Sequence, residues 1–292
     1  MILLTGGAGF LGKFVIKELL KSKKKIRCLV LEEGSLSESN NLEILIGNIR
    51  DRKTVDKAVR GTDYIIHLAA ALSPYDTKEL TEVNIQGTKN LVEAAKKYKV
   101  KKFIFISSEG AVQKFDNYGI SKAKAEEIVK KIKNHVILRP TVIYGKGDKK
   151  NIGKLIKIIS VFPFVPIIGD GKNKLQPVYA GDVAAAIKNA LFMGRGTYFA
   201  AGKEPISLNE IITVIESCLG IKRRIRIRLN LKIIKIVVAL MRFYKGRIIS
   251  PNVISPNIIE YFSKDQIYDI SKTIKELDYK PLSFYEGVKK SI

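Results

Sequence analysis

The stretch MILLTGGAGFLGKFVIKELL (residues 1–20) combines an apolar run, a glycine-rich loop and a helical pattern, in that order. Gly7, Gly9 and Gly12 have the spacing G-x-G-x-x-G, and Glu32 lies 20 residues after Gly12, at the end of the next strand-like run. Glycines at this spacing let backbone N–H groups approach a pyrophosphate at a helix N-terminus, and the acidic side chain accepts hydrogen bonds from a ribose. This context predicts a dinucleotide site rather than a turn with only a structural role.

Short apolar runs alternate with helical patterns over the first half of the chain. The strand-like runs are residues 1–5, 26–31, 42–47, 63–69, 102–107 and 135–139, and the helical patterns are residues 11–22, 52–59, 80–98 and 118–132. Apolar strands joined by helical crossovers predict an α/β fold with a doubly wound parallel sheet, covered on both faces. In such a Rossmann-type sheet, ligands bind at the carboxyl ends of the strands.

The rhythm changes after Gly147, where longer amphipathic segments such as 151–162 and 207–220 take over. We therefore predict an NAD(P)-binding Rossmann domain over residues 1–150 and a smaller substrate domain over residues 151–292. The helical pattern AGDVAAAIKNALF (180–192) indicates that a segment near 175–200 returns to the first domain.

Several classes of protein are disfavoured by composition. Cys28 and Cys218 lie far apart, which gives neither a disulfide framework nor a metal-ligand spacing. His67 and His135 each fall in an apolar run, where a buried structural role is the favoured interpretation. No leader precedes the first strand-like run, and no uncharged apolar run is long enough to span a bilayer. We expect a cytoplasmic protein without a metal site.

The chain is strongly basic, with a formal net charge of +24. Ten Lys or Arg residues and no acid lie between Ser217 and Ile259, and RIRIRL (224–229) alternates at period two, which places three arginines on one face of a strand. A membrane surface, a polyanion or an anionic substrate such as a nucleotide diphosphate would match this charge. A generally basic surface is the favoured interpretation, because basic residues also run through the first half.

The segment LKIIKIVVALMRFYKGR (231–247) is both apolar and basic. It could line a lipidic pocket or make peripheral contact with a membrane, but we favour an amphipathic core helix of the second domain. The basic residues form no recognised nucleic-acid-binding module, so nucleic acid is not an expected partner.

Tyr118 and Lys122 stand four residues apart in a helical pattern and therefore share one face of the helix. A tyrosine with a pKa near 10 is a weak base at neutral pH, and a nearby ammonium group favours the phenolate. We expect Lys122 to lower the pKa of Tyr118 into a range useful for proton transfer.

The chain resembles the extended and atypical short-chain dehydrogenases/reductases, the NAD-dependent epimerase/dehydratase family. Beyond TGGAGFLG (5–12), the matching motifs occur in order over roughly 190 residues, a span that makes the resemblance specific. They are GNIRD (47–51), HLAA (67–70), VNIQGTKNLVEAA (83–95), ISSEGAV (106–112), YGISK (118–122), LRPTVIYGKGD (138–148) and QPVYAGDVAAAI (176–187). The middle of the chain looks most like the branch related to the 39 kDa subunit of respiratory complex I.

The resemblance implies roles for individual residues. Tyr118 would exchange a proton, Lys122 would also hold the nicotinamide ribose, and Ser108 would bind the substrate oxygen. The implied cofactor contacts are Gly6, Gly7, Gly9, Phe10, Leu11, Gly12, Glu32, Asn48, Ile49, Leu68, Ala69, Ala70, Asn84, Tyr118, Lys122, Pro140 and Val142. Among these, Asn48 and Ile49 would contact adenine, Asn84 would shape the active site, and Pro140 with Val142 would lie beside the nicotinamide.

The chain departs from the family pattern in two places. Only nine residues separate Ser108 from Tyr118, a short loop that brings substrate size and turnover into question. Glu109 is followed by Gly110, which breaks the acidic pair of the dehydratases and disfavours dehydration. Where relatives that prefer NADP often carry Arg, this chain has Leu31, Glu32 and Glu33, whose carboxylates would repel a 2′-phosphate. We predict NAD rather than NADP.

The leading hypothesis is an NAD-dependent oxidoreductase or epimerase that acts on a hydroxyl/carbonyl pair of a small molecule, with a nucleotide sugar as the candidate substrate. One alternative is a hydroxysteroid- or dihydroflavonol-type dehydrogenase, since LRPTVIYGKGD fits that branch equally well. The alternative of another class is a non-catalytic nucleotide-binding module that docks on a partner protein. A homodimer formed through a helix pair is common in the family and is also considered.

Overall fold

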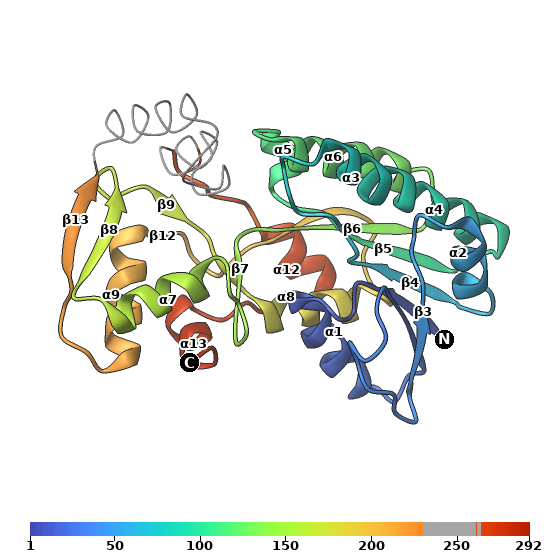
Figure 1. Cartoon of the computed structure of the whole chain (residues 1–292), viewed down its shortest axis with the longest axis horizontal. Helices are drawn as coiled ribbons and strands as arrows, with labels where there is room; N and C mark the ends of the chain where they lie inside the picture. Colours follow the sequence, from blue (N-terminus) through green and yellow to red (C-terminus); the bar gives the residue numbers. More distant parts are fainter. Residues whose placement is uncertain (230–260, 262–263) are drawn as a thin grey trace, which may run out of the picture. The chain divides into compact units, whose positions relative to one another are not determined.

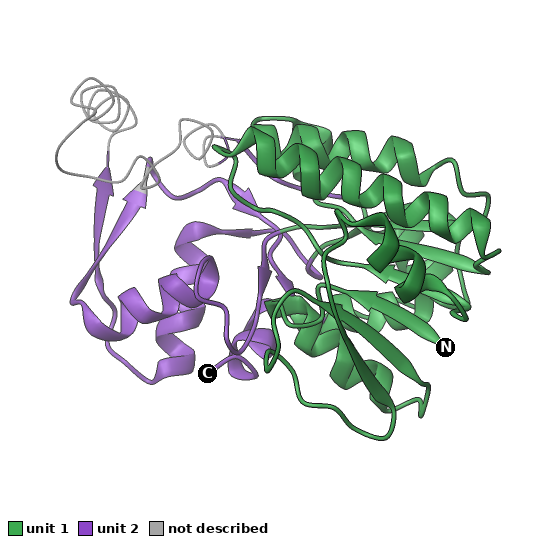
Figure 2. Cartoon of the chain, turned by 45° about the vertical axis from the view of Figure 1, so that its right-hand side comes forward, with its two compact units in different colours: residues 1–141, 180–201, 269–281 green, residues 142–179, 202–268, 282–292 purple. Residues whose placement is uncertain are grey.

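The computed structural model describes residues 1–229, 261 and 264–292, which divide into two compact units (Figure 2). Unit 1 comprises residues 1–141, 180–201 and 269–281, and unit 2 comprises residues 142–179, 202–268 and 282–292. The second unit thus begins at Val142 rather than near residue 151, and the returning segment spans 180–201. Residues 269–281, which the sequence analysis placed in the second domain, belong to unit 1.

Unit 1 is built on a seven-stranded parallel sheet with the order β11-β6-β5-β4-β1-β2-β3 (Figure 1). Its strands are β1 (Ile2–Thr5), β2 (Ile26–Val30), β3 (Leu42–Ile46), β4 (Tyr64–His67), β5 (Lys102–Ile106), β6 (His135–Pro140) and β11 (Gly196–Ala200). Its helices are α1 (Phe10–Leu20), α2 (Arg52–Val59), α3 (Thr77–Glu79), the π-helix η1 (Leu80–Gly87), α4 (Thr88–Lys97), α5 (Gly110–Gln113), α6 (Asn117–Val129), α8 (Ala180–Ala190) and α12 (Ser271–Leu277). The chain order reverses direction across the sheet between β1 and β4, as in a doubly wound fold.

The predicted parallel sheet is confirmed, and all six predicted strands are present within one or two residues at each end. The seventh strand, β11, was not predicted, because GTYFA (196–200) is a short run at the edge of the sheet without a clear apolar pattern. The helix predicted over residues 80–98 is divided into η1 and α4. The membrane or core-helix interpretation of residues 231–247 lies outside the described residues.

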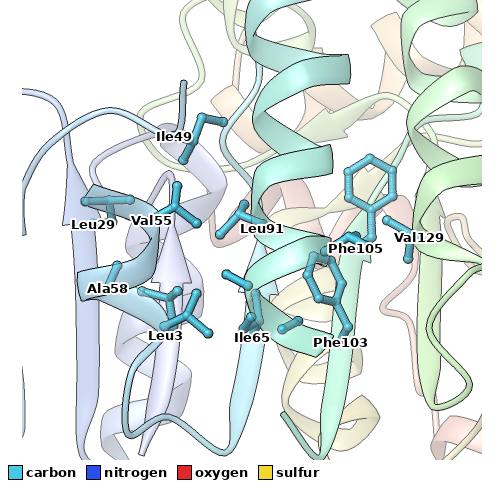
Figure 3. Packing of buried hydrophobic residues seen from close by; sticks show 14 of the residues in the cluster. Leu3, Leu29, Ile49, Val55, Ala58, Ile65, Leu91, Phe103, Phe105 and Val129 are labelled. Carbon is cyan, nitrogen blue, oxygen red and sulfur yellow. The ribbon is translucent and has the colours of Figure 1, made fainter. Parts of the chain in front are cut away.

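The core of unit 1 lies between the sheet and the helices α2, α4 and α6 (Figure 3). Leu3, Ile65 and Phe103 from the strands pack with Leu91 of α4 and Val129 of α6, and all five side chains are fully buried. Burial of each such side chain contributes roughly 1.5–3 kcal/mol. On the other face of the sheet, α1 and α8 pack against each other (Figure 1).

Polar side chains fix where several helices begin. The Asp51 carboxylate accepts hydrogen bonds from Lys53 N and Thr54 N at the start of α2, and the Asp116 carboxylate accepts one from Gly119 N at the start of α6. These acceptors satisfy backbone donors that have no partner within the helix. Because Asp116 precedes Tyr118 by two residues, its cap also fixes the turn that carries the predicted catalytic tyrosine.

Unit 2 consists of short strands and helices around its own core, which includes Val165, Ile167 and Ile211. Its strands are β7 (Ile143–Tyr144), β8 (Phe164–Ile168), β9 (Lys174–Leu175), β10 (Val178–Tyr179), β12 (Ile206–Ser207) and β13 (Ile225–Leu229), and its helices are α7 (Ile152–Val161), α9 (Leu208–Leu219) and α13 (Phe284–Lys289). The strand predicted from RIRIRL is confirmed as β13. None of the helices in the described part of the chain has both the length and the apolar character needed to cross a bilayer.

Candidate active site

The glycine loop connects β1 to α1 and is shaped by very close backbone approaches. Gly6 has a φ of +76°, and a Cβ atom there would lie 2.6 Å from Ala69 N. A Cβ atom at Gly12 would overlap the carbonyl oxygens of Gly6 and Gly7. Gly9 is the N-cap of α1, where no side chain forms a capping hydrogen bond. The first turn of α1 therefore presents backbone N–H groups that suit an anion such as a pyrophosphate.

Gly7 has a different function from the other glycines of the loop, because a Cβ atom there would overlap Sγ of Cys28 on β2. Gly12, the third glycine of G-x-G-x-x-G, is therefore required by close contacts within the loop itself. Gly7 instead allows the loop to pack on the sheet. Phe10 and Leu11 begin α1 and remain partly exposed, and the Phe10 ring meets that of Phe14 edge to face at 5.6 Å.

The residues predicted to contact the adenosine lie after β2 and β3. Glu32 is exposed in the turn that follows β2. The Asn48 side chain accepts a hydrogen bond of 2.9 Å from Arg50 N and thereby shapes the loop that follows β3. Ile49 is only 5% exposed and packs in the core, where Gly87 leaves room for its side chain. The predicted contact between Ile49 and adenine stays a prediction.

Leu68, Ala69 and Ala70 follow β4 and are partly exposed. Their backbone passes directly beside Gly6, and Ala69 N donates a hydrogen bond of 3.3 Å to Thr5 Oγ1 at the end of β1. The structure thus brings this predicted segment next to the glycine loop.

Asn84 lies in η1 and is only 2% exposed. Its side-chain amide accepts a hydrogen bond of 2.8 Å from Ala71 N, and it donates to Ala71 O at 3.0 Å and to Ser121 Oγ at 2.9 Å. This amide is thus engaged by the chain itself, and the predicted cofactor contact of Asn84 stays a prediction. Asn84 joins the segment after β4 to α6, and π-helical segments are frequent at functional sites.

Ser108 and Tyr118 are brought together where β5 ends and α6 begins, and their side chains share a hydrogen bond. The Ser108 hydroxyl also accepts a hydrogen bond of 3.1 Å from Gly110 N. The short connection between them contains α5, which packs closely on α6 because a Cβ atom at Gly119 would overlap the carbonyl oxygen of Gly110. The nine-residue connection therefore still brings the side chains of Ser108 and Tyr118 into contact.

Lys122 lies on α6, four residues after Tyr118, and is only 2% exposed. Its ammonium group donates a hydrogen bond of 2.6 Å to Ile106 O and lies 4.2 Å from the centre of the Phe105 ring. Burial lowers the pKa of Lys122 to about 7, and the nearby Glu126 carboxylate opposes that shift.

Burial raises the pKa of Tyr118 to about 12, the Asp116 carboxylate adds to this rise, and the hydrogen bond with Ser108 opposes it. The expectation that Lys122 lowers the pKa of Tyr118 is therefore wrong for this arrangement. The ammonium group is directed to the carbonyl oxygen of Ile106 instead. In this geometry Tyr118 keeps its proton at neutral pH.

His67 lies at the end of β4 and is fully buried, as predicted. Its ring nitrogens lie 2.7 Å from Thr5 Oγ1 and 3.0 Å from Thr88 Oγ1. Burial, together with the charge of Lys122, lowers the pKa of His67 to about 3. The ring is therefore neutral and connects β1, β4 and α4. His135 is partly buried, with Nδ1 at 2.6 Å from Ile132 O.

A buried ion pair that the sequence analysis missed lies one helical turn beyond Lys122. The Glu126 carboxylate accepts two hydrogen bonds from Arg139, at 2.9 Å and 2.6 Å, and a third from Ser107 Oγ at 2.6 Å. Glu126 is 2% exposed. The available signal was the spacing of four between Lys122 and Glu126, which places both on one helical face.

The last two predicted cofactor contacts fall in different units. Pro140 ends β6 and is buried, and its carbonyl oxygen accepts a hydrogen bond of 3.0 Å from Glu109 N. Val142 begins unit 2 and packs against the core of that unit. The structure therefore places Pro140, but not Val142, with the residues of unit 1. Within the described ranges, no cluster of His, Cys, Asp or Glu side chains is arranged to hold a metal ion.

Comparisons with known proteins were made for the whole chain. Residues 2–198 match the model of the NAD dependent epimerase/dehydratase family. A putative UDP-glucose 4-epimerase of Methanocaldococcus jannaschii is 30% identical, over 76% of this chain and 83% of that protein. The N-acetyl-alpha-D-glucosaminyl-diphospho-ditrans,octacis-undecaprenol 4-epimerase of Escherichia coli O157:H7 is 29% identical, over 76% of this chain and 73% of that protein.

The fold is also found in a crystal structure of UDP-glucuronic acid 4-epimerase from Bacillus cereus in complex with NAD. That structure aligns with a TM-score of 0.79 and 24% identity, over 99% of this chain and 96% of that one. The predicted Rossmann-type architecture is confirmed by this likeness. The narrower resemblance to the complex I branch stays a prediction.

Proposed function

The chain belongs to the NAD-dependent epimerase/dehydratase family, and from this membership we propose that it is an NAD-using enzyme acting on a sugar attached to a diphosphate. The observation that carries the proposal is the position of Ser108, Tyr118 and Lys122. Ser108 follows β5 and the glycine loop follows β1, so both lie at the carboxyl edge of one parallel sheet. This is the edge at which open α/β sheets bind ligands.

The residues of unit 1 fit a dinucleotide. Gly6 and Gly12 leave no room for a side chain beside the loop backbone, and the N-terminus of α1 has no side-chain cap. Both features suit a pyrophosphate. Glu32 and Glu33 are exposed after β2, where carboxylates favour the ribose hydroxyls of NAD over the 2′-phosphate of NADP. When bound, NAD supplies the hydride acceptor and donor for the reaction.

The proposed proton chemistry uses Ser108 and Tyr118. Their mutual hydrogen bond marks the place where a substrate oxygen would be held, with Ser108 orienting it and Tyr118 Oη exchanging its proton. With a pKa of about 12, Tyr118 is suited to donate a proton to a carbonyl oxygen. The reverse transfer needs a stabilised phenolate, and Lys122 is the cation on the same face of α6 that could provide it.

The substrate class follows from what the two relatives share. Their names give UDP-glucose in one case and a diphosphate-linked N-acetylglucosaminyl undecaprenol in the other, and both proteins are 4-epimerases. The shared chemistry is a sugar ester of a diphosphate, in which one hydroxyl-bearing carbon is inverted. We therefore propose epimerisation as the leading reaction, with net dehydrogenation as its alternative.

The test uses the purified full chain. The protein is denatured and the released nucleotide is identified by mass spectrometry. Intact protein is then incubated with NAD and UDP-glucose, and in parallel with the undecaprenyl diphosphate sugar. The 4-epimer is measured by chromatography and NADH by absorbance.

We expect NAD rather than NADP and formation of an epimer without net NADH. Net NADH formation, with these sugars or with a 3β-hydroxysteroid, would replace the epimerase by a dehydrogenase. Bound NAD without turnover of any probe would support the non-catalytic binding module instead.

A further inference from the structure

The two-stranded parallel sheet of β8 and β13 in unit 2 directs Arg224 and Arg226 toward the helices α7 and α9. Arg224 Nε donates to Ile159 O of α7 at 3.0 Å, and Arg226 Nη2 donates to Thr213 Oγ1 of α9 at 2.6 Å. Arg226 also lies 3.5 Å from the buried carboxylate of Glu216. Because side chains alternate along a strand, this arrangement turns the isoleucines of β13 away from the helices.

The opposite face of this sheet, which we call the outer face, consists of Phe164 and Pro166 on β8 with Ile225, Ile227 and Leu229 on β13. The register pairs Ile225 with Phe164 and Ile227 with Pro166, so these side chains lie next to one another. Ile225 is 69% exposed, Phe164 44% and Ile227 43%. Figure 1 shows β8 and β13 side by side, with α9 next to them.

An exposed apolar face is unexpected here, because every second residue from Arg224 to Arg228 is an arginine. A shift of one residue would have exposed the arginines and buried the isoleucines. Arg224 and Arg226 instead bind α7 and α9, and the contiguous apolar side chains lie on the outer face. Contiguous exposed apolar side chains with a polar surround mark an interaction surface.

Cations lie at the start of β13, next to the outer face. Lys222 and Arg223 are exposed in the loop that precedes β13, and Arg228 is exposed on the arginine face of β13. In the segments that contain β8 and β13, no acidic residue occurs between Lys149 and Gly169 or between Ser217 and Leu229. Of the acidic groups closest in sequence, Glu216 is buried and accepts a hydrogen bond from Arg224 N, whereas Asp170 is exposed after β8 and accepts one from Lys172 N.

We propose that the outer face docks on the surface of an anionic lipid bilayer. Apolar side chains enter the boundary between headgroups and acyl chains, while surrounding cations meet the anionic headgroups. A second copy of this chain is a poorer occupant, because pairing two such faces would bring like charges together. A nucleic acid would use the cations but leave the apolar side chains without a contact. The proposal does not depend on the reaction proposed above.

The test is flotation of the full-length protein with vesicles of phosphatidylcholine alone or of an equal mixture with phosphatidylglycerol. Two double variants address the two parts of the surface: Ile225→Ser with Ile227→Ser for the apolar part, and Lys222→Glu with Arg223→Glu for the charge. The matched controls lie in unit 1, namely Ile274→Ser, which is 48% exposed, and Lys57→Glu with Lys131→Glu, which are also exposed. Circular dichroism and thermal unfolding are used to check that each variant is folded.

We expect the protein to float with anionic vesicles, less so at high salt, and weakly with phosphatidylcholine alone. The apolar double variant should lower the partition coefficient by about tenfold or more. The charge variant should lower it by about fivefold for each cation removed, and more because the charge is reversed. The unit 1 controls should leave it unchanged.

Three results would overturn the proposal. They are no flotation with anionic vesicles, flotation that the outer-face variants leave unchanged, or equal loss in the unit 1 controls. A concentration-dependent dimer that Ile225→Ser with Ile227→Ser abolishes, without lipid binding, would assign the outer face to a second copy.

Discussion

Arg139 on β6 holds the carboxylate of Glu126 on α6 through two hydrogen bonds, from Nε at 2.9 Å and from Nη2 at 2.6 Å. The same carboxylate accepts a hydrogen bond from Ser107, the neighbour of Ser108. Glu126 lies one helical turn beyond Lys122. This pair therefore ties together the end of β5, α6 and β6, and we infer that Glu126 is a positioning residue for Lys122.

Glu126→Gln keeps an acceptor for Ser107 but removes the charge opposite Arg139. Breaking a buried pair in this way costs about 3–5 kcal/mol of folding stability. Because the Glu126 charge raises the pKa of Lys122, its loss should also move the Lys122-dependent step of the pH–rate profile to lower pH. The measurements are urea unfolding and kcat across pH.

Glu127→Gln is the matched control, since Glu127 is the exposed neighbour of Glu126. An unchanged pH profile in Glu126→Gln, with only stability lost, would reduce Glu126 to a structural role.

Tyr118→Phe removes the hydroxyl that shares a hydrogen bond with Ser108. Loss of a proton-transfer group should lower kcat by about 10²–10⁴-fold. The affinity for NADH, measured by fluorescence, should change little, because the glycine loop and the N-terminus of α1 are untouched. Tyr98→Phe, at the end of α4, is the control and should retain full turnover. Comparable turnover in Tyr118→Phe and Tyr98→Phe would remove Tyr118 from the mechanism.

The lowered pKa of Lys122 predicts how the free energy of unfolding depends on pH. Its pKa is about 7 in the folded protein, below its ordinary value of 10.5. Between these two values the unfolded chain holds a proton that the folded protein has released, so the free energy of unfolding should rise with pH through this window. Below pH 7 the folded protein carries the full cost of a buried ammonium group.

Lys122→Met removes that cost, and we expect it to be more stable than the parent protein below about pH 7 while losing turnover. Urea unfolding at several pH values measures the slope directly. Lys124→Met, on the same helix but exposed, is the control and should show the slope of the parent protein. A Lys122→Met slope identical to that of the parent would show that the ammonium group is not buried as described.

The sequence predicted six of the seven strands of unit 1, because each of these six is a short apolar run bounded by turn residues. It also predicted that Ser108, Tyr118 and Lys122 gather at one edge, since chain order places Ser108 after β5 and the tyrosine at the start of α6. The sequence pattern did not predict how individual side chains are oriented. Ile49 turns into the core beside Gly87, and Lys122 bonds to Ile106, because packing of distant segments decides both.

Residue spacing also did not predict side-chain partners that lie far apart in the sequence. The pair of Glu126 and Arg139 joins a helix to a strand. Arg139 lies in the motif LRPTVIYGKGD, but nothing in that motif indicates a partner on α6. The RIRIRL strand shows the same limit. Period two predicted that three arginines share a face, but not that this face would be directed to α7 and α9.

Gly6 offers a test of the glycine loop that separates steric exclusion from backbone strain. Gly6 and Gly61 have nearly the same φ, +76° and +75°, but a Cβ atom at Gly6 would lie 2.6 Å from Ala69 N, whereas at Gly61 nothing lies within 4 Å. Alanine at either position carries a left-handed strain of about 1 kcal/mol. Only Gly6→Ala must also displace the segment after β4.

We therefore expect Gly61→Ala to lower stability slightly and to bind NADH normally. Gly6→Ala should lower stability further and weaken NADH binding by on the order of 100-fold, because the loop can no longer hold its backbone N–H groups in place. Titration of NADH fluorescence and urea unfolding of both variants measure these two effects. Equal NADH affinity in Gly6→Ala and Gly61→Ala would mean that the loop is a structural turn, and the dinucleotide site would have to be sought elsewhere in the chain.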